Sequence, residues 1–254
     1  MSKTRIAATL LVVAGFVALG APDQSLAASS LPTCMNRTVT IMGTDGPDRL
    51  IGQSGVSDVI YGGLGNDQIN GGDFYEEDDV PGRAPDYNCG GPGADYIVGG
   101  PGNDHINGGD GNDTLWGQRG DDVVRGNAGA DHLRDLSCAD CDSGDDVQVG
   151  GPGPDDIFGG YGVDRLEGNG GADSVIDLEC DGPTTLLGGG GDDYLESWSS
   201  SFEGWHGNVC AVYFGDSASH DRVNGGLGED TAQVDTVDSV LAVEHLTRIT
   251  EPPA

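Results

Sequence analysis

Positive charge is scarce in this chain of 254 residues. Lysine and arginine number 11 against 43 aspartates and glutamates, and Lys3 is the only lysine. Contacts with a phosphate backbone depend on basic side chains. The composition therefore excludes an ordinary nucleic-acid-binding protein, and it makes cations the expected partners.

Long apolar runs are also scarce, and the one that exists lies at the start of the chain. Residues 6–19 are mostly apolar, follow Lys3 and Arg5, and precede the small residues around Ala27. A membrane span needs about 20 residues, whereas this order of charge, short apolar core and small residues is typical of a secretory signal peptide. We predict that residues 1–27 are a signal peptide, cleaved after Ala27 or Ala28. The rest would be secreted to the extracellular space, without a membrane span and with a net charge of about −33.

Aromatic residues make up only 6% of the chain, and an acidic, aromatic-poor composition alone is typical of disorder. A strict period argues against disorder. Residues 90–134 read as five uninterrupted nine-residue units: GGPGADYIV, GGPGNDHIN, GGDGNDTLW, GQRGDDVVR and GNAGADHLR. The same division gives seventeen consecutive units from Gly43 to Gln233, with the consensus GGxGxDxUx, in which U is aliphatic.

Two positions of the unit carry most of the pattern. The sixth residue is Asp in sixteen of the seventeen units, and Thr184 is the exception. The eighth residue is aliphatic almost throughout, but Asn88, Gln148 and Ala232 interrupt it. Over residues 43–233 the chain resembles the RTX calcium-binding repeat proteins, which share this nonapeptide. The dinucleotide fingerprint GxGxxG is not matched, because Asp stands where its third glycine would be.

The residue types of the unit predict its conformation. Glycine accepts the positive φ angles of a tight six-residue turn, and the three residues that follow form a short strand. Alternate strand side chains point in opposite directions, so the eighth residue faces inward and its neighbours face solvent. Two units complete one coil of eighteen residues. We therefore expect an all-β fold, a right-handed parallel β-roll of about seventeen units with loop insertions on one edge.

Stacked coils bring the sixth-position aspartates of successive turns close together. These carboxylates repel one another unless a cation lies between them. Calcium prefers six to eight oxygen ligands in flexible geometry, and the resemblance implies ligands from turn carbonyls and from the Asp of each of two stacked turns. Zinc and copper would require His or Cys, which the repeats rarely contain. The metal-free chain is expected to be mostly unfolded.

Insertions are confined to alternate units. Numbered from Gly43, all nine odd units have nine residues, whereas units 2, 4, 10, 14 and 16 have 10, 19, 15, 11 and 28. We call the turns of odd units the odd edge and those of even units the even edge. The odd edge is expected to hold an unbroken ladder of about eight calcium ions. Its candidate ligands are Asp48, Asp67, Asp95, Asp113, Asp131, Asp155, Asp173, Asp193 and Asp230. On the even edge, calcium is expected only around Asp104, Asp122, Asp146 and Asp164.

Six cysteines also follow the even edge. In an exported chain they favour disulfides over metal thiolates. Six cysteines allow fifteen pairings. Our prediction among these is Cys34 with Cys89, Cys138 with Cys141, and Cys180 with Cys210.

Three segments lie outside the regular repeat. Residues 28–42 are expected to be a degenerate unit or N-terminal cap, and residues 234–254 a C-terminal cap and tail, because a solenoid needs closed ends. The insertion at 197–220 contains five aromatic residues: Trp198, Phe202, Trp205, Tyr213 and Phe214. It is interpreted as a small hydrophobic cap, with a sugar-binding platform as the alternative.

No catalytic constellation is evident in the sequence, because HExxH and GxSxG are absent and the repeated carboxylates recur too often for one active site. The sequence favours a secreted calcium-binding roll with a structural or interaction role. The alternative is a roll that binds or acts on an extracellular polysaccharide or cell-surface partner through its even-edge loops. An ice-binding roll would require a flat row of Thr and Asn, which the odd turns do not contain.

Overall fold

The computed structural model describes residues 33–72, 84–135, 144–177, 184–197, 222–227, 231–234 and 239–248. All regular elements in these ranges are β-strands. None of this part of the chain forms a helix of the length and apolar character that crossing a membrane would require. The predicted signal peptide, residues 1–27, and the aromatic side chains of the insertion at 197–220 lie outside these ranges.

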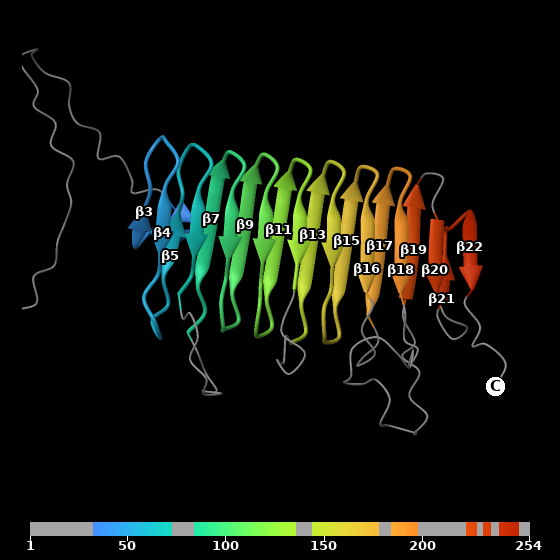
Figure 1. Ribbon diagram of the computed structural model, residues 1–254. Helices are drawn as coiled ribbons and strands as arrows, with labels where there is room; N and C mark the ends of the chain where they lie inside the picture. The colour runs from blue at the N-terminus through green and yellow to red at the C-terminus, as the bar shows by residue number, and fades with distance from the viewer. Residues whose placement is uncertain are drawn as a thin grey trace, which may run out of the picture. The chain divides into compact units, whose positions relative to one another are not determined.

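Twenty strands form two parallel sheets, and the parity of the unit decides which sheet each strand joins (Figure 1). The first sheet consists of β4 (Arg49–Ile51), β6 (Gln68–Asn70), β8 (Tyr96–Val98), β10 (Thr114–Trp116), β12 (His132–Arg134), β14 (Asp156–Phe158), β16 (Ser174–Asp177), β18 (Tyr194–Ser197), β20 (Thr231–Val234) and β22 (His245–Arg248). The second consists of β3 (Ile41–Met42), β5 (Val59–Tyr61), β7 (Tyr87–Pro92), β9 (His105–Asp110), β11 (Val123–Ala128), β13 (Val147–Pro152), β15 (Arg165–Gly170), β17 (Thr185–Gly190), β19 (Arg222–Leu227) and β21 (Ser239–Leu241). Consecutive strands alternate between the sheets, which confirms the predicted parallel β-roll.

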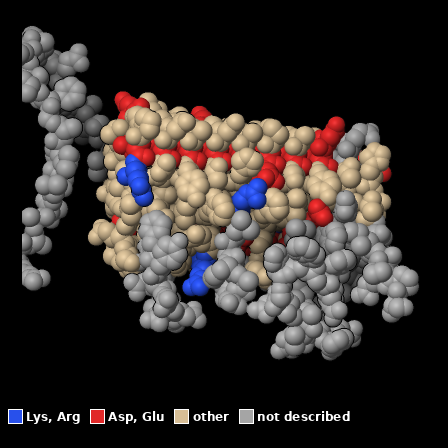
Figure 2. All heavy atoms as spheres, in the orientation of Figure 1, with Lys and Arg blue, Asp and Glu red and all other residues tan. Residues whose placement is uncertain are grey.

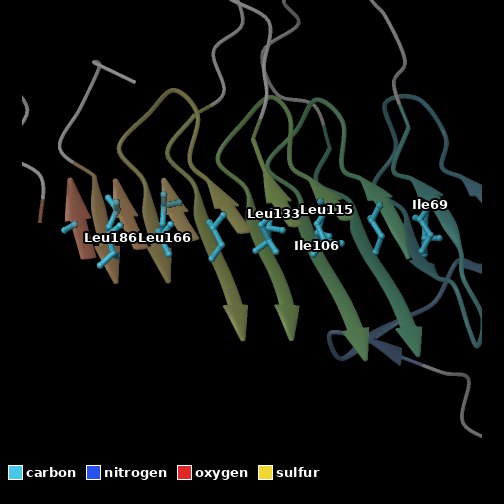
Figure 3. Close-up of a cluster of buried hydrophobic side chains, with 13 residues drawn as sticks. Ile69, Ile106, Leu115, Leu133, Leu166 and Leu186 are labelled. Carbon is cyan, nitrogen blue, oxygen red and sulfur yellow. The ribbon is translucent and has the colours of Figure 1, made fainter. Parts of the chain in front are cut away.

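The eighth residues of the units fill the space between the two sheets (Figure 3). Leu115 pairs with Ile97 on one side and with Leu133 on the other, so identical positions stack one coil apart. Each of the three side chains is fully buried. The interior is therefore one residue wide in each strand, as alternation of side chains across a short strand requires.

Strand length differs from the expectation of three residues. In the middle of the second sheet, strands such as β9 and β11 have six residues, because the first residues of the following odd turn continue the parallel pairing. Gly109 pairs with Gly91 in the preceding coil and with Asn127 in the next one. The odd-edge turns are thus stacked in backbone register, in addition to the strands that they connect.

The insertions of units 4, 10, 14 and 16 fall largely outside the described ranges, but the strands that flank them are described. Each insertion leads from a strand of the first sheet to a strand of the second, as from β6 to β7 and from β12 to β13. Regular even turns such as 99–104 make the same connection. All four insertions therefore share the even edge, as predicted.

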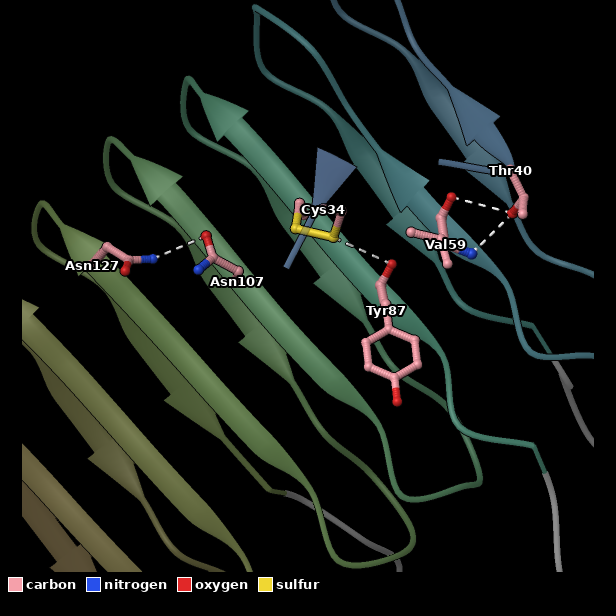
Figure 4. The surroundings of a disulfide bond; sticks show 7 residues. Cys34, Thr40, Val59, Tyr87, Asn107 and Asn127 are labelled. Carbon is pink, nitrogen blue, oxygen red and sulfur yellow. Dashed lines mark hydrogen bonds between the residues drawn. A yellow bond between two sulfur atoms is a disulfide. The ribbon is translucent and has the colours of Figure 1, made fainter. Parts of the chain in front are cut away.

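A short hairpin covers part of the outer face of the second sheet. β1 (Thr33–Cys34) and β2 (Arg37–Thr38) pair antiparallel, and Cys34 forms a disulfide with Cys89 of β7 (Figure 4). The predicted pairing of these two cysteines is confirmed; the other four cysteines lie outside the described residues. The Arg37 guanidinium carbon lies 3.7 Å from the centre of the Tyr87 ring.

The hairpin corrects one expectation about solvent exposure. Val59, Tyr87 and Cys89 occupy seventh and ninth positions, which were expected to face water, yet each is only 8% exposed. They pack with Cys34 in a second small hydrophobic cluster. The physical reason is that the hairpin, which precedes the repeats, excludes water from the outer face of these strands.

The disulfide should stabilise the N-terminal end of the roll. It closes a loop with a sequence separation of 55 residues. A cross-link of this span restricts the unfolded chain, so we expect replacement of both cysteines by Ser to lower the free energy of unfolding by about 3 kcal/mol. Denaturant titration in saturating calcium would measure the change. An unchanged midpoint would show that the calcium-loaded roll does not depend on this bond.

At the other end, β21 and β22 each extend one of the sheets by one strand. Val240 and Val243 are partly buried and pack against the hydrophobic interior. The described residues after the last predicted unit thus continue the stack of coils; that residues 234–254 form a C-terminal cap and tail stays a prediction.

Candidate metal centre

The sixth-position aspartates form two buried rows, one along each edge of the roll. On the odd edge, the side chains of Asp67, Asp95, Asp113, Asp131, Asp155, Asp173 and Asp193 are at most 3% exposed. On the even edge, Asp104, Asp122, Asp146 and Asp164 are at most 2% exposed. In the space-filling view, acidic side chains follow a line along the upper, odd edge (Figure 2). The turns thus bring together the predicted ligands that the structure describes; Asp230 lies outside the described residues.

One oxygen of each carboxylate holds the coils in register. The backbone N–H of Asp95 donates to Oδ1 of Asp113 at 2.8 Å, and that of Asp113 donates to Oδ1 of Asp131 at 2.8 Å. The same bond recurs along the even edge, for example from Asp104 to Asp122 at 2.7 Å. At Thr184, where the repeat lacks Asp, the hydroxyl accepts the N–H of Asp164 at 3.2 Å.

In most of these carboxylates, the second oxygen, Oδ2, accepts no such hydrogen bond. The Oδ2 atoms of Asp67, Asp95, Asp113, Asp131, Asp155 and Asp173 are buried and have no hydrogen-bond partner within the described ranges. The same holds for Oδ2 of Asp122 and Asp146 on the even edge. A buried anionic oxygen is strongly unfavourable unless a donor or a cation compensates it. When ionised, the carboxylates of both rows are therefore stabilised by a bound cation.

The space beside these oxygens is shaped by the glycine that begins most turns. A β-carbon built on Gly90 would lie 2.2 Å from Oδ2 of Asp95 and 2.5 Å from the carbonyl oxygen of Gly108 in the next coil. A β-carbon on Gly168 would lie 2.3 Å from Oδ2 of Asp173 and 2.6 Å from the Gly188 oxygen. Only glycine leaves this space open, and carboxylate and carbonyl oxygens line it.

Such a donor set fits calcium. Calcium binds carboxylate and backbone carbonyl oxygens in flexible geometry. Across the described part of the roll, no three His, Cys, Asp or Glu side chains converge on one metal position. The resemblance to RTX turns implies that most calcium ligands are backbone carbonyls, so such a cluster of side chains is not required for calcium.

The electrostatics of the two rows also favour a bound cation. Burial raises the pKa of Asp113 to about 7, and the neighbouring carboxylates of Asp131 and Asp95 act in the same sense, against the Asp95 N–H bond that lowers it. Burial likewise raises the pKa of Asp155 to about 7 and that of Asp95 to about 6. On the even edge, burial and the charge of Asp104 raise the pKa of Asp122 to about 9. Ionised rows are thus unfavourable in the folded chain without a counter-ion.

These pKa values predict an inverted pH dependence for the metal-free chain. Because the pKa of Asp113 is higher in the fold than its ordinary value, the folded form binds the proton more tightly than the unfolded form. The stability of the metal-free roll should therefore fall as pH rises from about 4 to about 7. Circular dichroism in buffer freed of calcium by a chelating resin should show more β-structure at pH 4.5 than at pH 7.5. Equal or greater structure at pH 7.5 would contradict this reading of the carboxylates.

The first turn of each row differs from those that follow. Oδ2 of Asp48 accepts the backbone N–H of Thr44 at 2.6 Å and its hydroxyl at 2.9 Å. Oδ2 of Asp58 accepts the N–H of Gln53 at 2.6 Å. The N-terminal coil therefore supplies hydrogen-bond donors to its own carboxylates, and the candidate ligand Asp48 is less dependent on a cation than the rest of its row.

Sequence reasoning missed buried acids outside the sixth position. Asp135 and Asp177 are 1% and 3% exposed and stand where most other units begin with glycine. Asp135 faces the even-edge row, because its charge contributes to the raised pKa of Asp122 and Asp146. The available signal was an acidic residue at the first position of the unit, where glycine is usual. Asp135 and Asp177, however, belong to units of irregular length, in which the consensus positions are hardest to assign. Asp58 and Asp86 are also buried, although neither was predicted as a ligand.

Comparison with known proteins agrees with the geometry. The RTX calcium-binding nonapeptide repeat model matches residues 42–74, 90–124, 108–134, 116–140, 142–175 and 181–199, which together cover more than half of the chain. A comparison with curated proteins gave no match. With the periodic turns, the two parallel sheets and the buried carboxylate rows, these matches show that the chain belongs to the family of RTX calcium-binding nonapeptide repeat proteins.

Proposed function

We propose that this protein is a secreted calcium-binding β-roll that folds when several calcium ions bind between its stacked turns, and that it has a structural or interaction role. The observation that carries the proposal is the row of buried Oδ2 atoms without hydrogen-bond partners in the described turns. RTX calcium-binding repeat proteins are typically secreted. The Cys34–Cys89 disulfide and the predicted signal peptide support an oxidising compartment outside the cytoplasm.

The odd edge would hold the main ladder. The ligands would be the carboxylates of Asp67, Asp95, Asp113, Asp131 and their successors, together with the carbonyl oxygens of the first glycines of the turns. Bound calcium would supply the positive charge that buried carboxylates need, and it would link each turn to the next one. In the folded state, the Asp-to-Asp hydrogen bonds would set the spacing of the ligands, because they fix the coils in register.

This arrangement couples export to folding. A chain with a large negative charge resists compaction while calcium is scarce, and binding to the native state alone stabilises that state by mass action. Calcium outside the cell would therefore trigger folding after secretion. The repeats form a calcium-binding scaffold, so the specific role would come from the surfaces that the roll displays.

Calorimetric titration of the full chain with calcium tests the proposal through its stoichiometry. About eight ions, bound together with the appearance of β-structure, are expected for a filled odd edge. The same titration of a variant with Asp113→Ala and Asp131→Ala should bind fewer ions, because both substitutions remove ladder ligands. A stoichiometry of one or two in the unaltered chain would be incompatible with a ladder.

A further inference from the structure

Asn88 interrupts the apolar interior of the roll. It is the eighth residue of its unit, is fully buried, and stands in register between Ile60 and Ile106, which are also fully buried. Neither its Oδ1 nor its Nδ2 has a hydrogen-bond partner within the described ranges. A buried amide without partners is unfavourable, and native proteins rarely contain one. Packing alone therefore does not account for Asn88.

The amide of Asn88 points to the even edge. A β-carbon built on Gly71, the first residue of the same unit, would lie 3.2 Å from Nδ2 of Asn88. The same point is 2.7 Å from Oδ2 of Asp86 and 2.3 Å from the carbonyl oxygen of Gly99 in the next coil. Three polar groups thus surround one position. Rotation of the amide by half a turn exchanges its nitrogen and oxygen, so Oδ1 can face this position equally well.

Unit 12 shows what normally occupies the place of this amide. A β-carbon on Gly159, the first residue of that unit, would lie 2.8 Å from Oδ2 of Asp164 and 3.1 Å from the Cδ1 methyl of Leu166. Leu166 is the eighth residue of unit 12, as Asn88 is of unit 4. The eighth side chain reaches the same place in both units, and in unit 4 it brings an amide instead of a methyl group.

We propose that Asn88 is a cation ligand, and that with Asp86 and the Gly99 carbonyl it forms a calcium site on the even edge. Asp86 is not among the ligands predicted from the sequence. A carboxylate, a carbonyl and an amide oxygen are all donors that calcium prefers. The site rests on the proposed function, since it requires that the turns bind calcium. It adds a side-chain ligand from inside the roll, which the nonapeptide consensus does not provide.

Native mass spectrometry of the calcium-loaded full chain tests the site, because it counts bound ions. Asn88→Leu restores the aliphatic residue that the repeat favours, and it should bind one calcium ion fewer than the unaltered chain. Asn88→Asp keeps an oxygen ligand and should retain the full number. Ile106→Leu alters the neighbouring interior without touching a polar group, and it should also retain the full number.

Three results would overturn the proposal. A full complement of ions in Asn88→Leu would show that the amide is no ligand. Loss of an ion in Asn88→Asp or in Ile106→Leu would show that occupancy depends on packing of the interior rather than on an oxygen at position 88. Failure of the proposed function is distinguishable from these results, because the unaltered chain would then bind no ladder of calcium ions at all.

Discussion

Removal of calcium is expected to abolish most of the β-structure of this protein at neutral pH. Most of the short strands bury only one aliphatic side chain, and turns such as those of Asp95, Asp113 and Asp131 bury a carboxylate whose Oδ2 lacks a hydrogen-bond partner in the described ranges. Binding at a concentration of one hundred times Kd stabilises a native state by about 2.7 kcal/mol per site, so eight independent sites would contribute on the order of 20 kcal/mol. That is larger than the net stability of a typical domain.

Far-ultraviolet circular dichroism would measure this dependence. The spectrum should be that of an unfolded chain in excess chelator and that of a β-protein after calcium is restored, at the same pH and ionic strength. Magnesium at the same concentration is the control, because it demands a tighter octahedral site and dehydrates reluctantly. Identical spectra in chelator and in calcium would contradict the central role given to the carboxylate rows.

Substitution of a glycine at the odd edge is expected to have the second largest effect. Gly171 has φ of +153°, and a β-carbon there would lie 2.0 Å from the carbonyl oxygen of Gly153 in the preceding coil. Gly171→Ala would force an alanine into an unfavourable conformation and displace the backbone of the adjacent turn. We expect the free energy of unfolding in saturating calcium to fall by about 4 kcal/mol or more, since backbone strain and steric overlap add.

The neighbouring glycine provides a matched control. A β-carbon on Gly170 would have no atom within 4 Å, and the residue does not adopt a positive φ angle. Gly170→Ala should therefore change the free energy of unfolding by less than about 0.5 kcal/mol. Denaturant titrations of the two variants would be compared under identical calcium. Equal destabilisation by both substitutions would show that the effect of Gly171→Ala does not come from the close stacking of the turns.

The sequence predicted the fold well because the signals of this fold are local and periodic. The glycines, the sixth-position Asp and the eighth aliphatic residue recur at a fixed spacing, and two units of nine residues return the chain to the same sheet. The restriction of insertions to even units also predicted correctly which edge would be interrupted. Asp113, for example, was identified as a member of the odd row from its position in the unit alone, and the structure shows that it is buried.

Features that do not recur with the nine-residue period were harder to predict from the sequence. The hairpin that buries Val59 and Tyr87 connects segments about fifty residues apart, and no repeat links them. The bond from the Thr44 hydroxyl to Asp48 depends on a threonine at the second position of the first turn, where the consensus has glycine. Asn88 was visible as an exception to the repeat, but its approach to Gly71 and Asp86 depends on the path of the chain in three dimensions.

The sequence by itself thus determined the coil, the two rows of carboxylates and the choice of an oxygen-binding cation, because each is a consequence of one short unit repeated in register. Only the tertiary structure decided which outer faces are covered, which carboxylate oxygens lack partners, and which interior amide reaches a turn. Those properties depend on contacts made by residues that differ from the consensus. A periodic pattern shows where such residues stand, but it does not determine what they contact.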